Sequence, residues 1–211
     1  PEGRAIVEEL ARWADIVLEN YKVGTLERYG LDEASLRRIN PRLIYCSVTG
    51  FGQTGPRREQ PAYDFLIQAM GGLMSVTGER DDKPGGGPQK VGVPIVDLMT
   101  GMYTAVAVLA ALARRNETGI GDAIDIAMMD VQVATLANQA MNYLISGKPP
   151  RRGGNAHPNI QPQDVFACRD GMIILACGND SQFVRLCQAL GHPEWATDER
   201  FVVNARRARN V

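Results

Sequence analysis

The stretch VPIVDLMTGMYTAVAVLAALA (residues 93–113) decides how this chain is interpreted, because a single carboxylate, Asp97, separates a short apolar run from a long one. No other charged residue lies between Lys90 and Arg114. From Leu98 onward the apolar residues recur all around the helical wheel, a pattern typical of a helix that is buried on most sides. The stretch therefore predicts a buried helix that begins just after Asp97.

Asp97 is expected at the N-cap of this helix. There its oxygens would accept free backbone amides, and the helix dipole would favour the ionised carboxylate by up to about 1 kcal/mol. These residues alone favour a capping aspartate, since Asp is a preferred N-cap residue. The alternative is a nucleophile or base at the mouth of a pocket. An aspartate in water has a pKa of about 3.9 and is already ionised at pH 7. The helix end is therefore needed to keep it ionised only where burial raises that pKa.

The composition is that of an ordinary globular protein. A chain of 211 residues is long enough for one full core, or for one domain and part of another. The formal net charge of -1 gives no reason to expect nucleic acid or an acidic membrane surface as a partner.

The cysteines and histidines argue against disulfides and metals. The four cysteines show no CxxC spacing and lie in apolar segments, so we expect buried free thiols in a reducing compartment. The two histidines are each followed by proline and form no HxxxH pair, so no metal site is expected. No signal peptide is visible, and the apolar helix after Asp97 is shorter than the roughly 18 residues that a membrane span needs. We therefore expect a cytoplasmic protein.

Strand-like and helix-like segments alternate along the first two thirds of the chain. Strands are expected at residues 15–19, 43–49 and 123–128. Helices are expected from the first residue, from Asp32 to Ile39, over residues 62–76, after Asp97 and over residues 130–146. This order predicts an α/β layer with parallel strands, in which residues 20–24 form a loop at the carboxyl end of a strand, where such sheets bind ligands.

Residues 50–55, GFGQTG, match the dinucleotide fingerprint GxGxxG letter for letter. That motif works only where a helix opens inside it, so that the helix amides meet a pyrophosphate. Here Pro56 and Pro61 follow closely and favour a loop. We therefore do not assign a nicotinamide or flavin site.

The second part of the chain begins after a proline-rich segment. Residues 148–162, KPPRRGGNAHPNIQP, are the best linker candidate. Beyond them a hairpin over residues 165–176 and a helix over residues 181–190 are expected. The predicted organisation is a partial large domain at residues 1–147, a linker at 148–162 and a partial small domain at 163–211. Because the chain opens in the middle of a helical pattern and without Met, we expect a fragment of a longer protein.

Several motifs resemble the class III CoA-transferases, the CaiB/BaiF family, and the resemblance spans essentially the whole chain. They are ADIVLENYKVG (14–24), ERYGLD (27–32), INPRLIYCSVTGFGQTGP (39–56), AYDFLIQAMGGLMSVTG (62–78), VDLMTGMYTA (96–105), RRNETGIGDAIDIAMMD (114–130) and RRGGNAHPN (151–159). The resemblance implies an α/β enzyme with a Rossmann-like large domain, a linker and the start of a smaller α+β domain. It also implies an interlocked homodimer for the full-length protein.

By this resemblance Asp97 is the catalytic residue. Its carboxylate attacks a donor acyl-CoA thioester to form a mixed anhydride, the released CoA thiolate then forms an aspartyl-CoA thioester, and an acceptor carboxylic acid completes the exchange in reverse. Backbone amides at the helix start are expected to stabilise the oxyanions. The family's contacts to coenzyme A fall on Asn20, Tyr21 and Arg28, with Arg28 as a partner for a CoA phosphate. Tyr63 is grouped with these CoA-binding residues.

The departures from the family pattern bear on which reaction is expected. Related acyl-CoA racemases place a histidine where this chain has Tyr63, so the base for proton abstraction is missing. Formyl-CoA transferase follows GGNA with a run of glycines, whereas this chain has HPNIQ at residues 157–161, which favours a larger dicarboxylate or carnitine-like acid over oxalate or formate. A racemase and a catalytically silent CoA-binding subunit remain the alternatives to a transferase.

Overall fold

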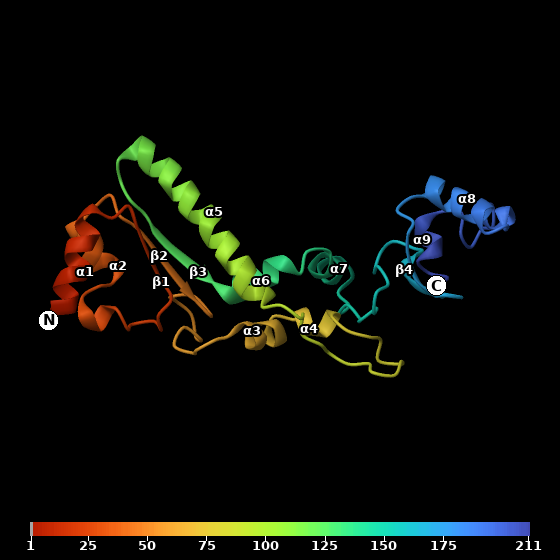
Figure 1. Ribbon diagram of the computed structural model, residues 1–211, viewed down its shortest axis with the longest axis horizontal. Helices are drawn as coiled ribbons and strands as arrows, with labels where there is room; N and C mark the ends of the chain where they lie inside the picture. The colour runs from red at the N-terminus through yellow and green to blue at the C-terminus, as the bar shows by residue number, and fades with distance from the viewer. Residues whose placement is uncertain (1) are drawn as a thin grey trace. The chain divides into compact units, whose positions relative to one another are not determined.

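The computed structural model describes residues 2–211, and the chain divides into two units (Figure 1). Unit 1 contains the described residues up to Met74 together with residues 90–147. Unit 2 contains residues 75–89 and 148–211. Residues 75–89, which the sequence analysis places in the first domain, therefore cluster with the second unit.

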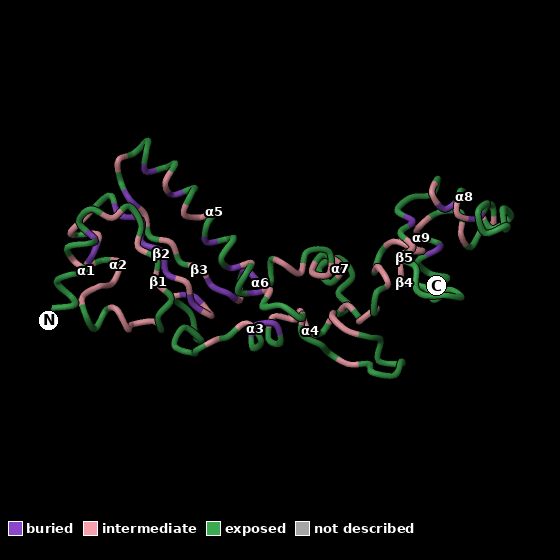
Figure 2. Tube along the Cα trace, viewed as in Figure 1, coloured by how far each residue is buried: buried purple, intermediate pink, exposed green. Residues whose placement is uncertain are grey.

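Three parallel strands form the sheet of unit 1, as predicted. Their order is β1 (Ile16–Glu19), β2 (Ile44–Thr49) and β3 (Ala123–Ala127). The central strand β2 is almost entirely buried, because it has a neighbour on each side and helices over it (Figure 2). In contrast, β1 is an edge strand whose alternate residues remain exposed.

Helices lie on both faces of this sheet. On one face α1 and α2 share a core with β2, whose members are Ala11, Leu36, Leu43 and Tyr45, while α5 lies on the other face (Figure 1). α5 contacts β2, β3, α3 and α6. The helices of unit 1 are α1 (Glu2–Trp13), the short 3-10 helix η1 (Glu27–Tyr29), α2 (Glu33–Ile39), α3 (Asp64–Met70), α5 (Ile95–Thr118), α6 (Met128–Thr135) and α7 (Asn138–Ser146). The division between the units falls within the short helix α4 (Leu73–Val76).

Two helices that the sequence predicts as continuous are interrupted. The first breaks into α3 and α4 at Gly71 and Gly72, where Gly72 takes a φ of 88°. Gly71 permits close packing here, because a Cβ at this position would lie 1.3 Å from Oε1 of Gln132 in α6. The second breaks into α6 and α7 at Ala137, whose φ of 47° is incompatible with a helix.

The central helix is longer and more exposed than the sequence analysis expects. α5 has 24 residues, because it continues through the polar residues 114–118. Among residues 2–211 it is the one helix whose length and hydropathy reach those of a membrane span. Core helices of globular proteins meet the same criterion, and α5 packs on two strands of the sheet.

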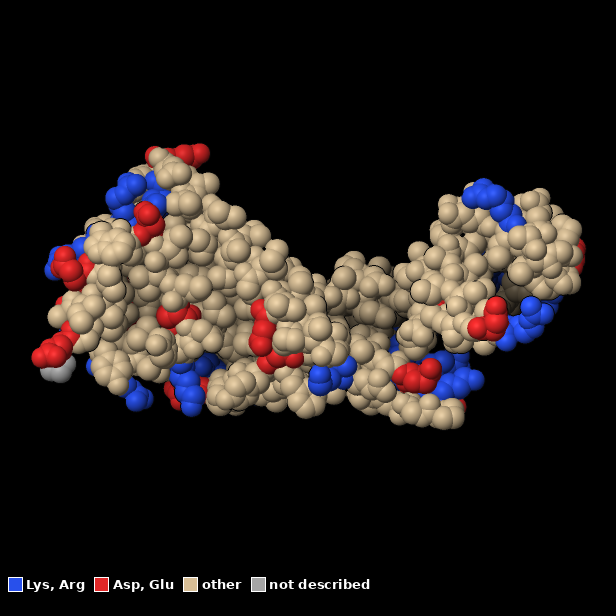
Figure 3. Space-filling model, in the orientation of Figure 1, with Lys and Arg blue, Asp and Glu red and all other residues tan. Residues whose placement is uncertain are grey.

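Only one face of α5 is buried, since the three-stranded sheet covers it from one side. The buried residues are Val96, Thr100, Thr104, Ala111 and Arg115. The opposite face is apolar and exposed, and Figure 3 shows few charged side chains along it. At the far end of the helix, Arg115 is buried and ion-paired with Asp15 at 2.9 Å.

Unit 2 contains the predicted antiparallel hairpin and a small helical core. The hairpin pairs β4 (Gln163–Cys168) with β5 (Gly171–Ala176), and the helices are α8 (Asp180–Ala189), the 3-10 helix η2 (Pro193–Ala196) and α9 (Asn204–Arg207). Cys177, Phe183 and Cys187 form its core. Cys46 is buried in unit 1, but Cys168 is exposed at the hairpin turn, so the expectation of buried thiols is wrong for that residue.

The N-cap of α2 gives a first prediction. Asp32 accepts hydrogen bonds from Ser35 N at 3.0 Å and from Ser35 Oγ at 2.8 Å. Partial burial alone would raise the pKa of Asp32, but these hydrogen bonds and Arg38 together hold it below its usual value. Asp32→Ala should therefore lower the free energy of unfolding by about 1 kcal/mol at pH 7, as measured by urea denaturation.

Asp32→Asn is the matched control, because it keeps a capping oxygen without the charge. Because the folded-state pKa is lowered, the contribution of the charge is fully present above the unfolded-state value of 3.8 and is lost as the pH falls through the folded-state pKa. Equal stability of Asp32→Ala and the unsubstituted chain at pH 7 would contradict this assignment of the cap.

Candidate active site

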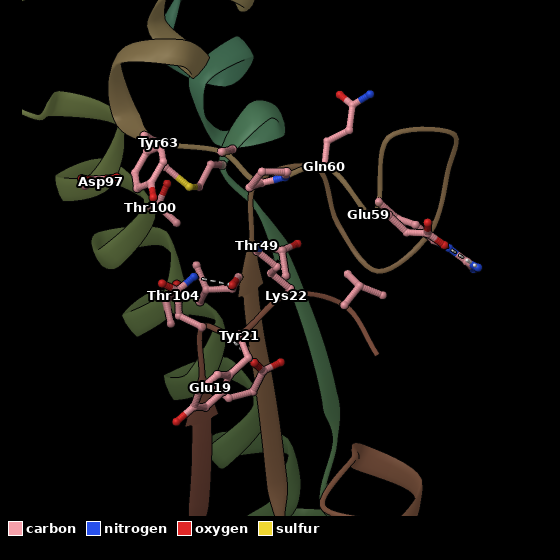
Figure 4. Close-up of a pocket in the computed structure, with 18 of the residues that line it drawn as sticks. Glu19, Tyr21, Lys22, Thr49, Glu59, Gln60, Tyr63, Asp97, Thr100 and Thr104 are labelled. Carbon is pink, nitrogen blue, oxygen red and sulfur yellow. Dashed lines mark hydrogen bonds and ion pairs between the residues drawn. The ribbon is translucent and has the colours of Figure 1, made fainter. Parts of the chain in front are cut away.

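A cavity of about 750 Å³ opens at the carboxyl ends of β1 and β2. Its wall includes four of the five residues that the sequence analysis assigns to the site: Asn20, Tyr21, Tyr63 and Asp97. In Figure 4, Asp97, Thr100 and Thr104 lie along α5 on one side of the cavity, and Tyr63 lies across its upper end. The parallel sheet therefore brings together residues that are far apart in the sequence.

Asp97 is not the N-cap of α5, so the predicted capping role is wrong. The helix begins at Ile95 after Pro94, which places Asp97 third in the helix. Its carboxylate is exposed to the cavity and accepts no hydrogen bond from the part of the chain that the structure describes. Partial burial and, secondarily, the negative charge of Asp64 raise the pKa of Asp97 above its usual value.

Asp64, at the first position of α3, satisfies the amides at the start of α5. Its Oδ1 accepts a hydrogen bond from Val96 N at 2.7 Å and a longer one from Asp97 N at 3.4 Å. Its Oδ2 accepts one from Nε2 of Gln68 at 2.6 Å, and Oε1 of Gln68 accepts one from Val91 N at 2.9 Å. The sequence analysis assigned no role to Asp64.

The expected oxyanion donors at the start of α5 are not available in this structure. The amides of Val96 and Asp97 bond to Asp64, and those of Ile95 and Leu98 bond to the carbonyls of Val93 and Pro94. All four amides at this helix end are therefore already paired in this structure, and none is free to donate to an oxyanion.

Two threonines supply unpaired donors on the same face of α5 as Asp97. Thr100 and Thr104 follow Asp97 at intervals of three and seven residues, which places all three side chains on one stripe of the helix. Both threonines line the cavity and are buried, and neither hydroxyl has a hydrogen-bond partner among residues 2–211. The sequence analysis missed this role, although the helical spacing from Asp97 could have indicated it.

Asn20 and Tyr21 lie in the loop that leaves β1. The Nδ2 group of Asn20 donates to the carbonyl of Val48 at 2.6 Å, which ties this loop to the end of β2. The backbone amide of Tyr21 donates to a carboxylate oxygen of Glu19 at 2.7 Å. Tyr21 and Tyr63 are 58% and 79% exposed, and both line the cavity, so they are available to a ligand there.

Arg28 does not line this cavity. It lies in η1, on the wall of a second cavity of about 1280 Å³, which is also lined by residues of all three strands. The two cavities share the basic residues Lys22 and Arg58, which the sequence analysis did not assign, and the acidic residues Glu19 and Glu59. A ligand that entered both cavities would therefore pass side chains of both charges on its way from Arg28 toward Asp97.

The GxGxxG segment is a loop, as expected. No helix begins between Gly50 and α3. The loop is attached to the sheet by hydrogen bonds from Gly52 N to Oγ1 of Thr49 at 2.9 Å and from Gln53 N to Oδ2 of Asp125 at 2.8 Å. These amides are used within the protein and present no helix end to a pyrophosphate.

Comparison with known proteins gives consistent matches over the whole chain. The sequence model of "CoA-transferase family III" matches residues 1–211. The chain is 55% identical to the succinate–glutarate CoA-transferase of Agrobacterium fabrum, over 98% of this chain and 51% of that protein. It is 44% identical to the acetyl-CoA:oxalate CoA-transferase of Acetobacter aceti, over 98% of this chain and 52% of that protein.

A solved structure has the same fold. The crystal structure of a CaiB/BaiF family protein from Brucella suis superposes with a TM-score of 0.80 at 54% identity, covering 99% of this chain and 54% of that one. The chain spans about half the length of the curated relatives it matches. The predicted α/β fold with a parallel sheet is confirmed by this match.

The raised pKa of Asp97 predicts an effect on stability. A carboxylate whose pKa is higher in the folded than in the unfolded state opposes folding wherever it is ionised. Asp97→Asn should therefore raise the free energy of unfolding at pH 7, by less than about 1 kcal/mol because the site is open to solvent. The gain should disappear as the pH falls below 3.8, where the carboxyl group is neutral in both states. Urea denaturation at both pH values measures this, and a loss of stability at pH 7 would show that the carboxylate is stabilising instead.

Proposed function

This chain belongs to CoA-transferase family III, and on that basis we propose that the full-length protein moves coenzyme A from an acyl-CoA thioester to a free carboxylic acid. The observation that carries the proposal is the Asp97 carboxylate, which faces a cavity at the carboxyl end of the sheet without any hydrogen bond within residues 2–211. A carboxylate in this state has its lone pairs available for covalent chemistry.

The proposed reaction begins with attack of an Asp97 oxygen on the donor thioester carbonyl. A C–O bond forms, the C–S bond breaks, and the CoA thiolate leaves a mixed anhydride. The thiolate then attacks the aspartyl carbonyl, which gives an aspartyl-CoA thioester and releases the donor acid as its carboxylate. The acceptor carboxylate repeats both steps in reverse order and leaves with CoA, which regenerates the Asp97 carboxylate.

The hydroxyls of Thr100 and Thr104 are the proposed donors to the polar groups of the bound substrate. They are buried beside the cavity with unused hydrogen-bonding capacity, which is costly unless a ligand satisfies it. A hydroxyl that donates to a developing oxyanion would replace the helix amides that Asp64 occupies.

We assign the CoA contacts to both cavities. Asn20, Tyr21 and Tyr63 lie around the cavity that contains Asp97, which suits the thioester end of the ligand. Arg28 lies in the second cavity, which suits a phosphate of the nucleotide end. Lys22 lines both cavities and would provide further positive charge between them, whereas Arg58 is paired with Glu59 at 3.7 Å.

The acids exchanged are proposed to be dicarboxylic acids larger than oxalate. Support comes from the relative at 55% identity, which is a succinate–glutarate CoA-transferase. The segment HPNIQ at residues 157–161, in place of a glycine run, favours the same choice. Cytoplasmic localisation and an interlocked homodimer of the full-length protein complete the proposal.

Asp97→Asn in the full-length enzyme should lower kcat by several decades, at about 1.4 kcal/mol of barrier per decade, while the fold is retained. Incubation with labelled acyl-CoA followed by hydroxylamine should yield a hydroxamate at Asp97 in the unsubstituted enzyme and none in the variant. Asp122→Asn is the control, because Asp122 pairs with Arg114 near the other end of α5. A racemase would exchange the α-hydrogen of its substrate without a hydroxamate, and a silent CoA-binding subunit would do neither.

Arg28→Ala should raise KM for acyl-CoA by about tenfold with little change in kcat, because a charge-assisted bond to phosphate contributes about 1.5–3 kcal/mol. Assaying the unsubstituted enzyme and Arg28→Ala with a dephospho-CoA thioester shows which phosphate is bound. If the 3′-phosphate is the partner, the tenfold difference should vanish with that substrate. An unchanged KM for acyl-CoA would exclude Arg28 from the CoA site.

A further inference from the structure

The amino end of α5 is capped from a different helix. Helices leave their first four amides without intrahelical partners, and a side chain at or near the N-cap commonly satisfies them. In α5 the N-cap is Pro94, which has no side-chain hydrogen bond to offer. The carboxylate that accepts from Val96 N and Asp97 N belongs to Asp64 in α3, which lies 33 residues before Asp97.

A buried glutamine fixes the orientation of this capping carboxylate. Gln68 lies one turn after Asp64 in α3 and is completely inaccessible to solvent. Its amide nitrogen donates to Oδ2 of Asp64, and its amide oxygen accepts from Val91 N. The segment that leads into α5 is therefore attached to α3 at two points, through Val91 and through Val96, by one connected set of hydrogen bonds.

This arrangement matters because Asp97 itself lies in the first turn of α5. An acidic side chain at this position of a helix commonly folds back onto the free amides of the helix start. An oxygen engaged in that way would point along the helix axis and have fewer lone pairs for attack. With Val96 N and Asp97 N bonded to Asp64, the Asp97 side chain has no such partner to turn to.

We propose that Asp64, held by Gln68, is a positioning residue that caps α5 in place of Asp97 and so leaves both Asp97 oxygens free to attack the thioester. This inference rests on the proposed function. Asp64 does not line the cavity and is therefore not expected to touch the substrate. Its negative charge also contributes, after partial burial, to the raised pKa of Asp97.

Three variants of the full-length enzyme separate capping from simple packing. Asp64→Ala removes the cap. Asp64→Asn keeps an oxygen for Val96 N but turns an NH₂ group toward the NH₂ group of Gln68, so one hydrogen bond is lost. The double variant Asp64→Asn/Gln68→Glu exchanges the amide and the carboxylate. The carboxylate introduced at position 68 can then accept from the amide introduced at position 64 and from Val91 N, so every hydrogen bond can form again.

Asp64→Ala should lower kcat by about 100-fold and leave KM for acyl-CoA within about threefold, because the nucleophile is misplaced while the CoA contacts persist. Asp64→Asn should lose about tenfold in kcat, and the double variant should recover to within about threefold of the unsubstituted enzyme. A residue needed only for packing would not be rescued by this exchange. Circular dichroism and gel filtration establish that each variant is folded.

Recovery in the double variant supports the inference. It is overturned if Asp64→Ala keeps full kcat, or if the double variant is no better than Asp64→Asn. If Asp64→Ala fails to fold, the comparison of the other two variants still decides. The hydroxylamine trap in the unsubstituted enzyme tests the proposed function separately: absence of a hydroxamate there would refute the covalent mechanism, whereas a hydroxamate with unimpaired Asp64 variants would refute only the positioning role.

Discussion

Two requirements meet at the start of α5 and conflict with each other. Backbone amides at a helix start need acceptors, while a carboxylate that acts as a nucleophile needs its oxygens free. In this chain the conflict is resolved by a second carboxylate, Asp64, which accepts from the helix start at 2.7 Å and leaves Asp97 facing the cavity. The position of α3 therefore matters to the chemistry, although α3 contributes little to the cavity wall.

Close contacts at small residues determine where α3 lies. Gly50, at the end of β2, approaches Ala62 so closely that a Cβ would lie 2.2 Å from the Ala62 Cβ. Gly71, at the end of α3, lies against the fully buried Gln132 of α6. The two contacts hold the segment from residue 62 to residue 71 between the sheet and α6. Close packing at these glycines thus helps to hold the Asp64 carboxylate at the start of α5, which is remote from it in the sequence.

The sequence predicted the parts of this structure that depend on local patterns. The strand runs predicted a parallel sheet, the Asp32 cap predicted the start of α2, and prolines after Gly55 predicted a loop where the letters alone suggest a dinucleotide site. What the sequence could not show depends on contacts between distant segments. The hydrogen bond from Val96 N to Asp64 spans 32 residues. Local sequence therefore pointed to Asp97 as the residue that caps α5, whereas the capping carboxylate is that of Asp64. The breaks at Gly72 and Ala137, where φ is positive, are likewise not encoded in the helical periodicity.

An ordinary amphipathic helix buries its apolar face, whereas α5 buries several polar residues and exposes an apolar face. Its buried stripe includes Thr100, Thr104 and Arg115, while the exposed side carries Leu98, Met102, Val106 and Leu109. Burying four such side chains contributes about 1.5–3 kcal/mol each, a sum comparable to the whole stability of a typical domain. A polar stripe toward the cavity is what a substrate site requires, while the apolar residues lie on the other face, which is exposed in this structure. That face is consistent with the larger interlocked assembly that we propose, since a second layer of protein there would cover the apolar residues and leave the cavity open.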